Sequence, residues 1–174
     1  ISIGYSSTAS GHYSITLGRD TISGGAFSTA LGYLSVSNGL YSLAQGYQSY
    51  SNGISSIAMG YQAKSCGSYS VSLGQNNYAI GDNSFSVGLN STAIGDYSIA
   101  MGLNSTASSY AETILGILAT TSSGDSINWN NTDRLFVIGN GTSTSARSDA
   151  LVMLKNADTS LHGNMNISKG LNVS

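Results

Sequence analysis

The sequence predicts an all-β fold, a parallel β-roll built from stacked coils of 14 residues each. Two observations support this prediction: glycine recurs every 14 residues from Gly4 to Gly116, and large and small side chains alternate before each of these glycines. A second glycine lies midway through each coil from Gly11 to Gly95, and the series lapses at Ser109. A strict internal period of this kind is typical of proteins in which each repeat packs on the next.

The six residues that end at each main glycine form the first predicted strand of a coil. Residues 69–74 read Tyr-Ser-Val-Ser-Leu-Gly, and residues 97–102 read Tyr-Ser-Ile-Ala-Met-Gly. This alternation has the period of a β-strand with one bulky face and one small face. A helix is disfavoured because each of the regularly spaced glycines would cost roughly 1 kcal/mol relative to alanine.

The other half of each coil is shorter and more polar, as in residues 35–39, and predicts a second, short strand. Each glycine is expected to end a strand at a sharp turn with a positive φ, a conformation that residues with a Cβ resist. We expect the bulky residues, such as Ile15 and Leu17, to fill the inside of the coil. The small face, which includes Ser14 and Thr16, is then expected to meet identical copies of the chain around a symmetry axis.

From about Asp133 the chain predicts a β-rich cap that covers the last open coil. Apolar segments at residues 135–138 and 150–154 predict two strands. A sparser strand series then continues to the end of the sequence, through Leu161, Met165, Ile167, Leu171 and Val173.

The single tryptophan, Trp129, is expected to plug the end of the roll, with a ligand platform as the alternative. The predicted organisation is a roll over residues 1–117, a transition over 118–133, and a cap or shaft segment over 134–174. Because the last residues read as a strand cut off in mid-pattern, the chain is expected to be a piece of a longer protein.

The hexamers of the roll resemble a known repeat. Residues 56–60 and 98–102 both read Ser-Ile-Ala-Met-Gly, and residues 90–95 read Asn-Ser-Thr-Ala-Ile-Gly. Over residues 1–117 the chain resembles the head repeats of YadA-type trimeric autotransporter adhesins, which also occur in phage tail-fibre-like proteins. This resemblance implies a left-handed parallel β-roll, an intertwined or side-by-side homotrimer, and an adhesive role outside the cell.

The C-terminal part resembles a different group. Residues 134–143 and 147–156 are similar to segments that precede endosialidase-type self-cleaving chaperone domains. The chain itself contains neither the coiled-coil stalk nor the membrane anchor of an autotransporter, so the mode of anchoring stays open.

Composition disfavours several classes of function. The net charge is −2 and only 8% of residues are charged, which disfavours binding to nucleic acid through phosphate contacts. Cys66 is the only cysteine, so an intrachain disulfide is excluded. Since no apolar run approaches about 18 residues, no membrane span is expected.

No catalytic, cofactor or metal site is predicted, so the chain is not expected to be an enzyme. His12, His162 and Cys66 lie in unrelated parts of the sequence, without the spacing of metal ligands. Asp82 and Asp96 occupy the same position in successive coils, where they form either a cation site or two exposed Gly-Asp turns. The sequence also holds glycosylation sequons that are expected to arise by chance, at Asn90, Asn104, Asn130, Asn140, Asn166 and Asn172.

Tyrosines form the one candidate binding surface. One series follows the main glycines, at Tyr5, Tyr33, Tyr47 and Tyr61, and the other opens the hexamers, at Tyr13, Tyr41, Tyr69 and Tyr97. These rings are expected either to bind glycans or collagen-like chains, or to stack on one another as part of the architecture.

Three functions fit these observations. The first is a trimeric fibrous protein on a bacterial surface or a phage-like particle, with an adhesive or receptor-recognising head whose receptor the sequence does not name. The second is a purely structural spacer of a phage-tail-fibre-like particle. The third is an ice-binding solenoid, which needs a regular threonine row; the row is broken here, at Ser7, Thr21, Ser35, Ser49, Ala63, Asn77 and Ser91.

Overall fold

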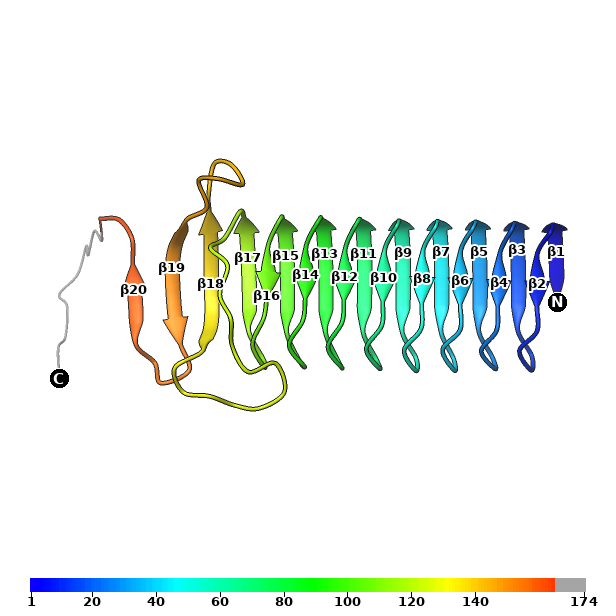
Figure 1. The fold of residues 1–174 in the computed structure, drawn as a ribbon, viewed down its shortest axis with the longest axis horizontal. Coiled ribbons are helices and arrows are strands. Elements are labelled where there is room, and N and C mark those ends of the chain that lie inside the picture. The colour runs from blue at the N-terminus through cyan, green and yellow to red at the C-terminus, as the bar shows by residue number, and fades with distance from the viewer. Residues whose placement is uncertain (165–174) are drawn as a thin grey trace, which may run out of the picture.

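The computed structural model describes residues 1–164, which form an all-β rod with the N-terminus at one end and the cap at the other (Figure 1). One sheet has twelve strands and the other has eight. The long strands are β1 (Ser2–Tyr5), β3 (Ile15–Arg19), β5 (Thr29–Tyr33), β7 (Leu43–Tyr47), β9 (Ile57–Tyr61), β11 (Val71–Gln75), β13 (Phe85–Leu89), β15 (Ile99–Leu103) and β17 (Thr113–Ile117). The short strands are β2 (Thr8–Ala9), β4 (Ile22–Ser23), β6 (Val36–Ser37), β8 (Tyr50–Ser51), β10 (Lys64–Ser65), β12 (Tyr78–Ala79), β14 (Thr92–Ala93) and β16 (Thr106–Ala107).

Each coil contributes one long strand to the first sheet and one short strand to the second. Neighbouring coils pair in parallel and in a constant register, so that Ile57 pairs with Val71 and Lys64 with Tyr78. Residues 14 positions apart therefore stack in columns along the rod. The predicted parallel β-roll of 14-residue coils is confirmed.

The prediction of what lies inside the coil is wrong. The side chains between the two sheets are the small ones: Ala44 and Ala58 are fully buried, whereas Ile15 is 40% and Leu17 is 50% exposed. The two sheets are joined by short turns and lie close together. Serine, alanine and threonine therefore fill most of the space between them, and Asn77 and Ile114 are larger exceptions. The bulky side chains consequently stand on the outer face of the long sheet, and the small face is not available to another chain.

Hydrogen bonds connect the two sheets across this narrow interior. The Oγ atoms of Ser51 and Ser56 lie 2.6 Å apart, and Ser56 Oγ also donates to the carbonyl of Gly53. The same serine pair, with the same 2.6 Å separation, recurs in neighbouring coils, at Ser23 and Ser28, Ser37 and Ser42, and Ser65 and Ser70. The interior is thus held by short polar contacts where larger domains use hydrophobic packing.

The pairing fails wherever alanine occupies the short strand. Ala79 and Ala93 stand where other coils have the first serine of the pair, and the hydroxyls of Ser84 and Ser98 opposite them are buried without a hydrogen-bond partner. Ser14, opposite Ala9, has the same defect. Leaving a buried hydroxyl unpaired costs about 1–3 kcal/mol, so these coils are weaker than their neighbours.

The main glycines lie inside the long strands, at the fourth of five positions, and not at strand ends as expected. Gly60 has φ +131°, and a Cβ at this position would lie only 2.0 Å from the carbonyl oxygen of Gly74 in the next coil. The midway glycine series is interrupted at Ser109, in the last coil.

The loop that follows β17 crosses the end of the roll beside this serine. A Cβ at Gly124 in that loop would lie only 2.6 Å from the Cβ of Ser109, so the glycine leaves room for the serine side chain.

The cap continues the long sheet. Strand β18 (Arg134–Asn140) pairs in parallel with β17, and β19 (Asp149–Leu154) and β20 (Thr159–Leu161) follow as antiparallel strands. The strands expected at residues 135–138 and 150–154 lie within β18 and β19. Met165, Ile167, Leu171 and Val173 lie outside the described residues. The part of the chain that the structure describes contains no helix long and apolar enough to cross a membrane.

A buried ion pair closes the end of the roll, and the prediction that Trp129 plugs it is wrong. Glu112 replaces serine in the last coil and accepts hydrogen bonds from the backbone N–H groups of Ser108 and Ser109. Arg134 Nε from the cap donates to Glu112 Oε1 at 2.7 Å, and both side chains are buried. Trp129 remains 53% exposed. The last coil leaves backbone N–H groups without a strand partner. A carboxylate can accept hydrogen bonds from these groups, whereas the indole of a tryptophan can only donate one.

Replacing Ala93 by serine is expected to stabilise the protein by ~1 kcal/mol, because Ser98 Oγ gains the partner that Ser56 has in Ser51. Urea unfolding at a fixed chain concentration measures the change. In the Ser98→Ala background the Ala93→Ser substitution should give no gain. An equal gain in both backgrounds would show that the two hydroxyls do not interact.

Serine occupies the equivalent position of the preceding coils, so Glu112→Ser is the natural substitution at this site. It is expected to cost about 3–5 kcal/mol, because the buried Arg134 guanidinium loses its nearest carboxylate and keeps only Asp149, at 3.9 Å. The double variant Glu112→Leu/Arg134→Met removes both charges of this pair, while the nearby carboxylate of Asp149 keeps its hydrogen bonds from Thr120. It should therefore lose less stability than the single variant in the same unfolding measurement. A double variant as unstable as the single one would contradict this account of the cap.

Candidate binding surface

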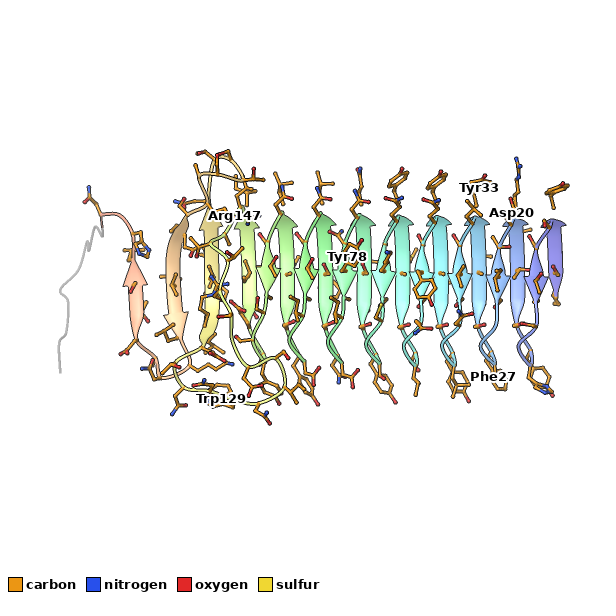
Figure 2. The ribbon with its side chains drawn as sticks, viewed as in Figure 1. Asp20, Phe27, Tyr33, Tyr78, Trp129 and Arg147 are labelled. Carbon is orange, nitrogen blue, oxygen red and sulfur yellow. The ribbon has the colours of Figure 1, made fainter. Side chains whose placement is uncertain are left out.

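The two tyrosine series lie on opposite edges of the rod. Tyr33 stands at the edge where the long strands end, and Phe27, which shares a column with Tyr13 and Tyr41, lies at the opposite edge (Figure 2). The two series therefore form two separate rows and do not converge on one site.

The first row is a continuous stack. The ring centroids of Tyr33 and Tyr47 are 5.3 Å apart, and those of Tyr47 and Tyr61 are 4.9 Å apart with an angle of 3° between the ring planes. Arg19 fills the gap between Tyr5 and Tyr33, with its guanidinium carbon 5.5 Å from each ring centroid. Sequence reasoning missed Arg19, although its position in the same column was a usable signal.

The second row is a stack at its N-terminal end only. Phe27 lies between Tyr13 and Tyr41, with centroid distances of 5.1 Å on both sides. Tyr69 and Tyr97 have no aromatic residue in the adjacent coils of this column. Each of these rings sits on a residue with φ between 55° and 59°, a strained conformation for a bulky side chain.

Stacking determines what these rows present to solvent. A ring inside a stack has both faces covered by its neighbours, so it offers only its edge and its hydroxyl. This geometry supports the architectural role of the rows. Binding of a glycan or collagen-like chain by the tyrosines stays a prediction.

The other candidate residues do not assemble into a reactive site. His12 lies against Tyr13 in the first coils, whereas His162 follows the last cap strand at the other end of the rod. Desolvation raises the pKa of the exposed Cys66 thiol, against a smaller opposing effect of Lys64, which disfavours the reactive thiolate. Among the described residues no three His, Cys, Asp or Glu side chains are grouped as metal ligands.

Asp82 and Asp96 form a backbone-bonded ladder. Asp82 Oδ1 accepts a hydrogen bond of 2.7 Å from Ser68 N, and Asp96 Oδ1 accepts one of 2.8 Å from Asp82 N. Each carboxylate thus ties its coil to the preceding one. This arrangement fits exposed Gly-Asp turns better than a cation site, because backbone N–H groups already bind the carboxylates.

The row considered for ice binding faces the interior. Thr21, Ser35, Ser49, Ala63, Asn77 and Ser91 are all fully buried. A buried row has no access to an ice surface, so the ice-binding hypothesis loses the residues on which it depended. The sequons at Asn90, Asn104, Asn130 and Asn140 fall on turns, loops or strand ends, and those at Asn166 and Asn172 lie outside the described residues.

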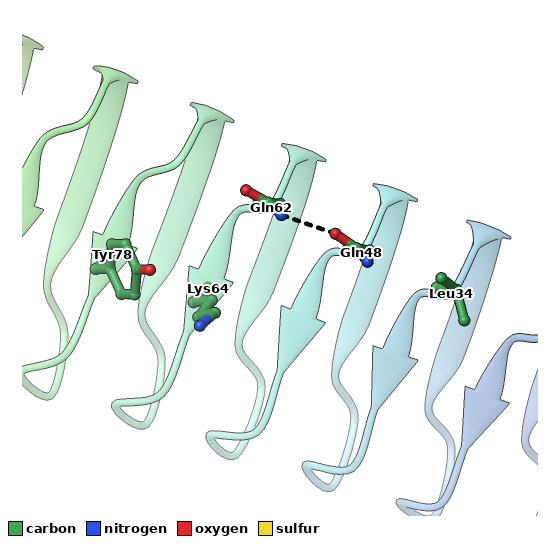
Figure 3. Close-up of a pocket in the computed structure, with 5 residues that line it drawn as sticks. All are labelled: Leu34, Gln48, Gln62, Lys64 and Tyr78. Carbon is green, nitrogen blue, oxygen red and sulfur yellow. Dashed lines mark hydrogen bonds between the residues drawn. The ribbon is translucent and has the colours of Figure 1, made fainter.

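A shallow groove runs beside the short strands and is lined by Leu34, Gln48, Gln62, Lys64 and Tyr78 (Figure 3). Gln62 Nε2 donates to Gln48 Oε1 at 2.7 Å, and Lys64 Nζ lies 5.0 Å from the Tyr78 ring centroid. Because these groups partner one another, the groove offers few free polar atoms to a ligand.

The outer face of the long sheet carries a continuous apolar surface over the described part of the chain. Two columns of side chains cover it, and the strand registers extend both columns from the roll across β18 to β20. The first column consists of Ile15, Thr29, Leu43, Ile57, Val71, Phe85, Ile99, Thr113, Phe136, Met153 and Thr159. The second consists of Ile3, Leu17, Leu31, Gln45, Met59, Leu73, Val87, Met101, Leu115, Ile138, Leu151 and Leu161. We call this surface the apolar wall.

The roll matches a known family. The model of the YadA head domain repeat (2 copies) matches residues 1–21, 23–49, 37–63, 51–77, 67–91, 79–105 and 93–110. A search of curated proteins gave no match. The matched segments cover the coils from β1 to β16 and confirm the resemblance of the roll to YadA-type head repeats. The resemblance of residues 134–156 to segments before chaperone domains stays a prediction.

Replacing Tyr47 by glutamine, which the chain itself uses in this column at Gln75, is expected to cost about 1–2 kcal/mol through the loss of two ring stacks. Tyr69→Asn is the matched control, since Asn83 occupies that column and Tyr69 has no ring beside it. Thermal unfolding should separate the two variants. Equal losses would mean that stacking contributes nothing to stability.

Proposed function

We propose that this chain, which belongs to the YadA head domain repeat family, is the non-catalytic head of a homotrimeric, adhesive fibre on a cell surface. The family is one of surface-exposed adhesin heads that form trimers. Membership supports the extracellular location and the trimer. The receptor of this chain is a separate question, because fold alone does not establish function.

The apolar wall is the observation on which the trimer rests. A soluble monomer rarely exposes a continuous apolar surface of this extent. Only Thr29, Gln45, Thr113 and Thr159 interrupt the two columns, and burial of apolar area contributes about 25 cal/mol per Å². Three chains that turn their long sheets toward a common axis would bury the wall and leave the short sheets outside.

The wall also favours a trimer that includes the cap. Phe136 and Ile138 on β18 continue the columns of the roll, and Met153 and Leu151 on β19 extend them further. The contacts between the three chains would then include both the roll and the cap. The family match itself covers the roll alone.

A structural spacer, as in a phage-tail-fibre-like particle, is the second candidate. The stack of Tyr33, Tyr47 and Tyr61 favours it, because these rings support one another and the faces between them are not available to a ligand. Binding of the purified trimer to cells, matrix proteins and glycans distinguishes the two functions. Specific, saturable binding supports the adhesive head, and its absence on all three surfaces supports the spacer.

Replacing Leu73 in the apolar wall by glutamate is expected to dissociate the trimer, because three carboxylates would be buried near the axis without partners. Light scattering should give three times the 17.8-kDa chain mass for the parent and one chain mass for the variant. Thr92→Glu, on the outer face of short strand β14, is the matched control and should remain trimeric. A parent of one chain mass, or a Leu73→Glu trimer, would contradict the proposed assembly.

A further inference from the structure

Trp129 is exposed and yet firmly held. It lies in the loop between β17 and β18, at the lower edge of the rod in Figure 2, and is 53% exposed. Its Nε1–H donates to Asn131 Oδ1 at 2.8 Å, which fixes the plane of the indole. Lys155 Nζ lies 5.3 Å from the ring centroid, so one face of the ring rests against a cation.

Lys155 is itself fixed beneath the ring. Its side chain is fully buried, and its Nζ lies 3.8 Å from Asp133 Oδ2 and 5.9 Å from the Tyr110 ring centroid. The backbone N–H of Lys155 donates to the carbonyl of Asp133 at 2.9 Å, which ties strand β19 to the loop. The indole is thus supported by Lys155 on one face, while about half of the Trp129 surface stays accessible to solvent.

This geometry differs from that of the tyrosine rows. Tyr47 has a ring on each side, whereas Trp129 has Lys155 against one face, stacks on no other ring and is 53% exposed. A free, rigid aromatic face is the form of aromatic group on which an amphipathic ligand packs, since little conformational entropy is lost on binding.

The groups around the ring restrict the ligand further. Asp125 precedes the tryptophan in the same turn, and its Oδ1 accepts hydrogen bonds of 2.9 Å from the N–H groups of Ile127 and Asn128. These bonds lower the pKa of Asp125, so its carboxylate is charged at neutral pH and repels anionic ligands. Lys155 behind the ring disfavours a cationic ligand on the open face. A neutral ligand with one apolar face and several hydroxyls suits both conditions.

We propose that Trp129 is the stacking platform of a carbohydrate site, which binds the apolar C–H face of a neutral pyranose. The exposed carboxylate of Asp125, four residues earlier in the same loop, then accepts hydrogen bonds from sugar hydroxyls. This inference rests on the proposed adhesive function and names the ligand class for it. It also assigns that role to the cap loop, away from the tyrosine rows.

The single tryptophan allows a direct test, because all indole fluorescence of the chain comes from Trp129. The full chain, in its native assembly, is titrated with methyl β-galactopyranoside and with N,N′-diacetylchitobiose, and N-acetylneuraminic acid serves as the acidic comparison. At least one neutral sugar should change the emission saturably, with a Kd of about 1 mM for a small ligand. The acidic sugar should produce no such change.

Variants test whether the ring itself binds. Calorimetry should show at least a tenfold weaker affinity for Trp129→Ala, partial affinity for Trp129→Phe, and parental affinity for Tyr69→Asn. Light scattering of each variant checks the assembly. If Trp129→Ala fails to fold, the Trp129→Phe variant and the fluorescence titration of the parent still decide the question.

Three outcomes would overturn the proposal. They are the absence of a response to both neutral sugars, unchanged affinity in Trp129→Ala, and an indole that acrylamide fails to quench in the native assembly. The last result would mean that a neighbouring copy covers the ring. A trimer that still binds cells in any of these cases would leave the proposed adhesive function intact, which separates the two failures.

Discussion

The narrow gap between the two sheets is the constraint on which the rest of the structure depends. Coils of 14 residues with two turns leave room inside mainly for small side chains such as Ala58 and Ser56. The chain therefore has almost no hydrophobic interior of its own. Its bulky apolar side chains have to stand outside, on one face of the long sheet. A roll of this width consequently leaves an apolar face exposed on the single chain, and the proposed trimer would cover that face.

The same constraint explains why the interior is polar. Between closely spaced sheets, serine hydroxyls reach one another and nearby carbonyls, and the pair formed by Ser51 and Ser56 repeats through the middle coils. The pairing stops at the coils of Ala79 and Ala93, and at the end of the roll Glu112 and Arg134 form a buried ion pair instead. Both solutions follow from the rule that buried polar groups need partners. The side chains of the apolar wall, by contrast, lie outside the coil and need no hydrogen-bond partners, so they can be apolar.

The sequence was sufficient to predict the roll, because the glycine period fixes the register: every residue pairs with the one 14 positions later. It was insufficient to predict which face is inside, since alternation reveals two different faces and says nothing about the width of the gap between them. The expectation for Ile15 and Leu17 failed for this reason. The expectation for Trp129 failed because the contacts at the end of the roll join residues far apart in sequence, such as Glu112 and Arg134.

The candidate surfaces were predictable to a similar extent. The columns of tyrosines follow from the period, and Arg19 and Phe27 belong to them by position alone. Whether a ring shows its face or its edge depends on its neighbours in three dimensions, so the difference between Tyr47 and Trp129 has no signature in the sequence. A repeat multiplies each local contact along the fibre, and rings in consecutive coils, such as Tyr33, Tyr47 and Tyr61, cover one another. A ligand that needs a free aromatic face is therefore better served where the repeat stops, and the loop at the end of this roll is such a place.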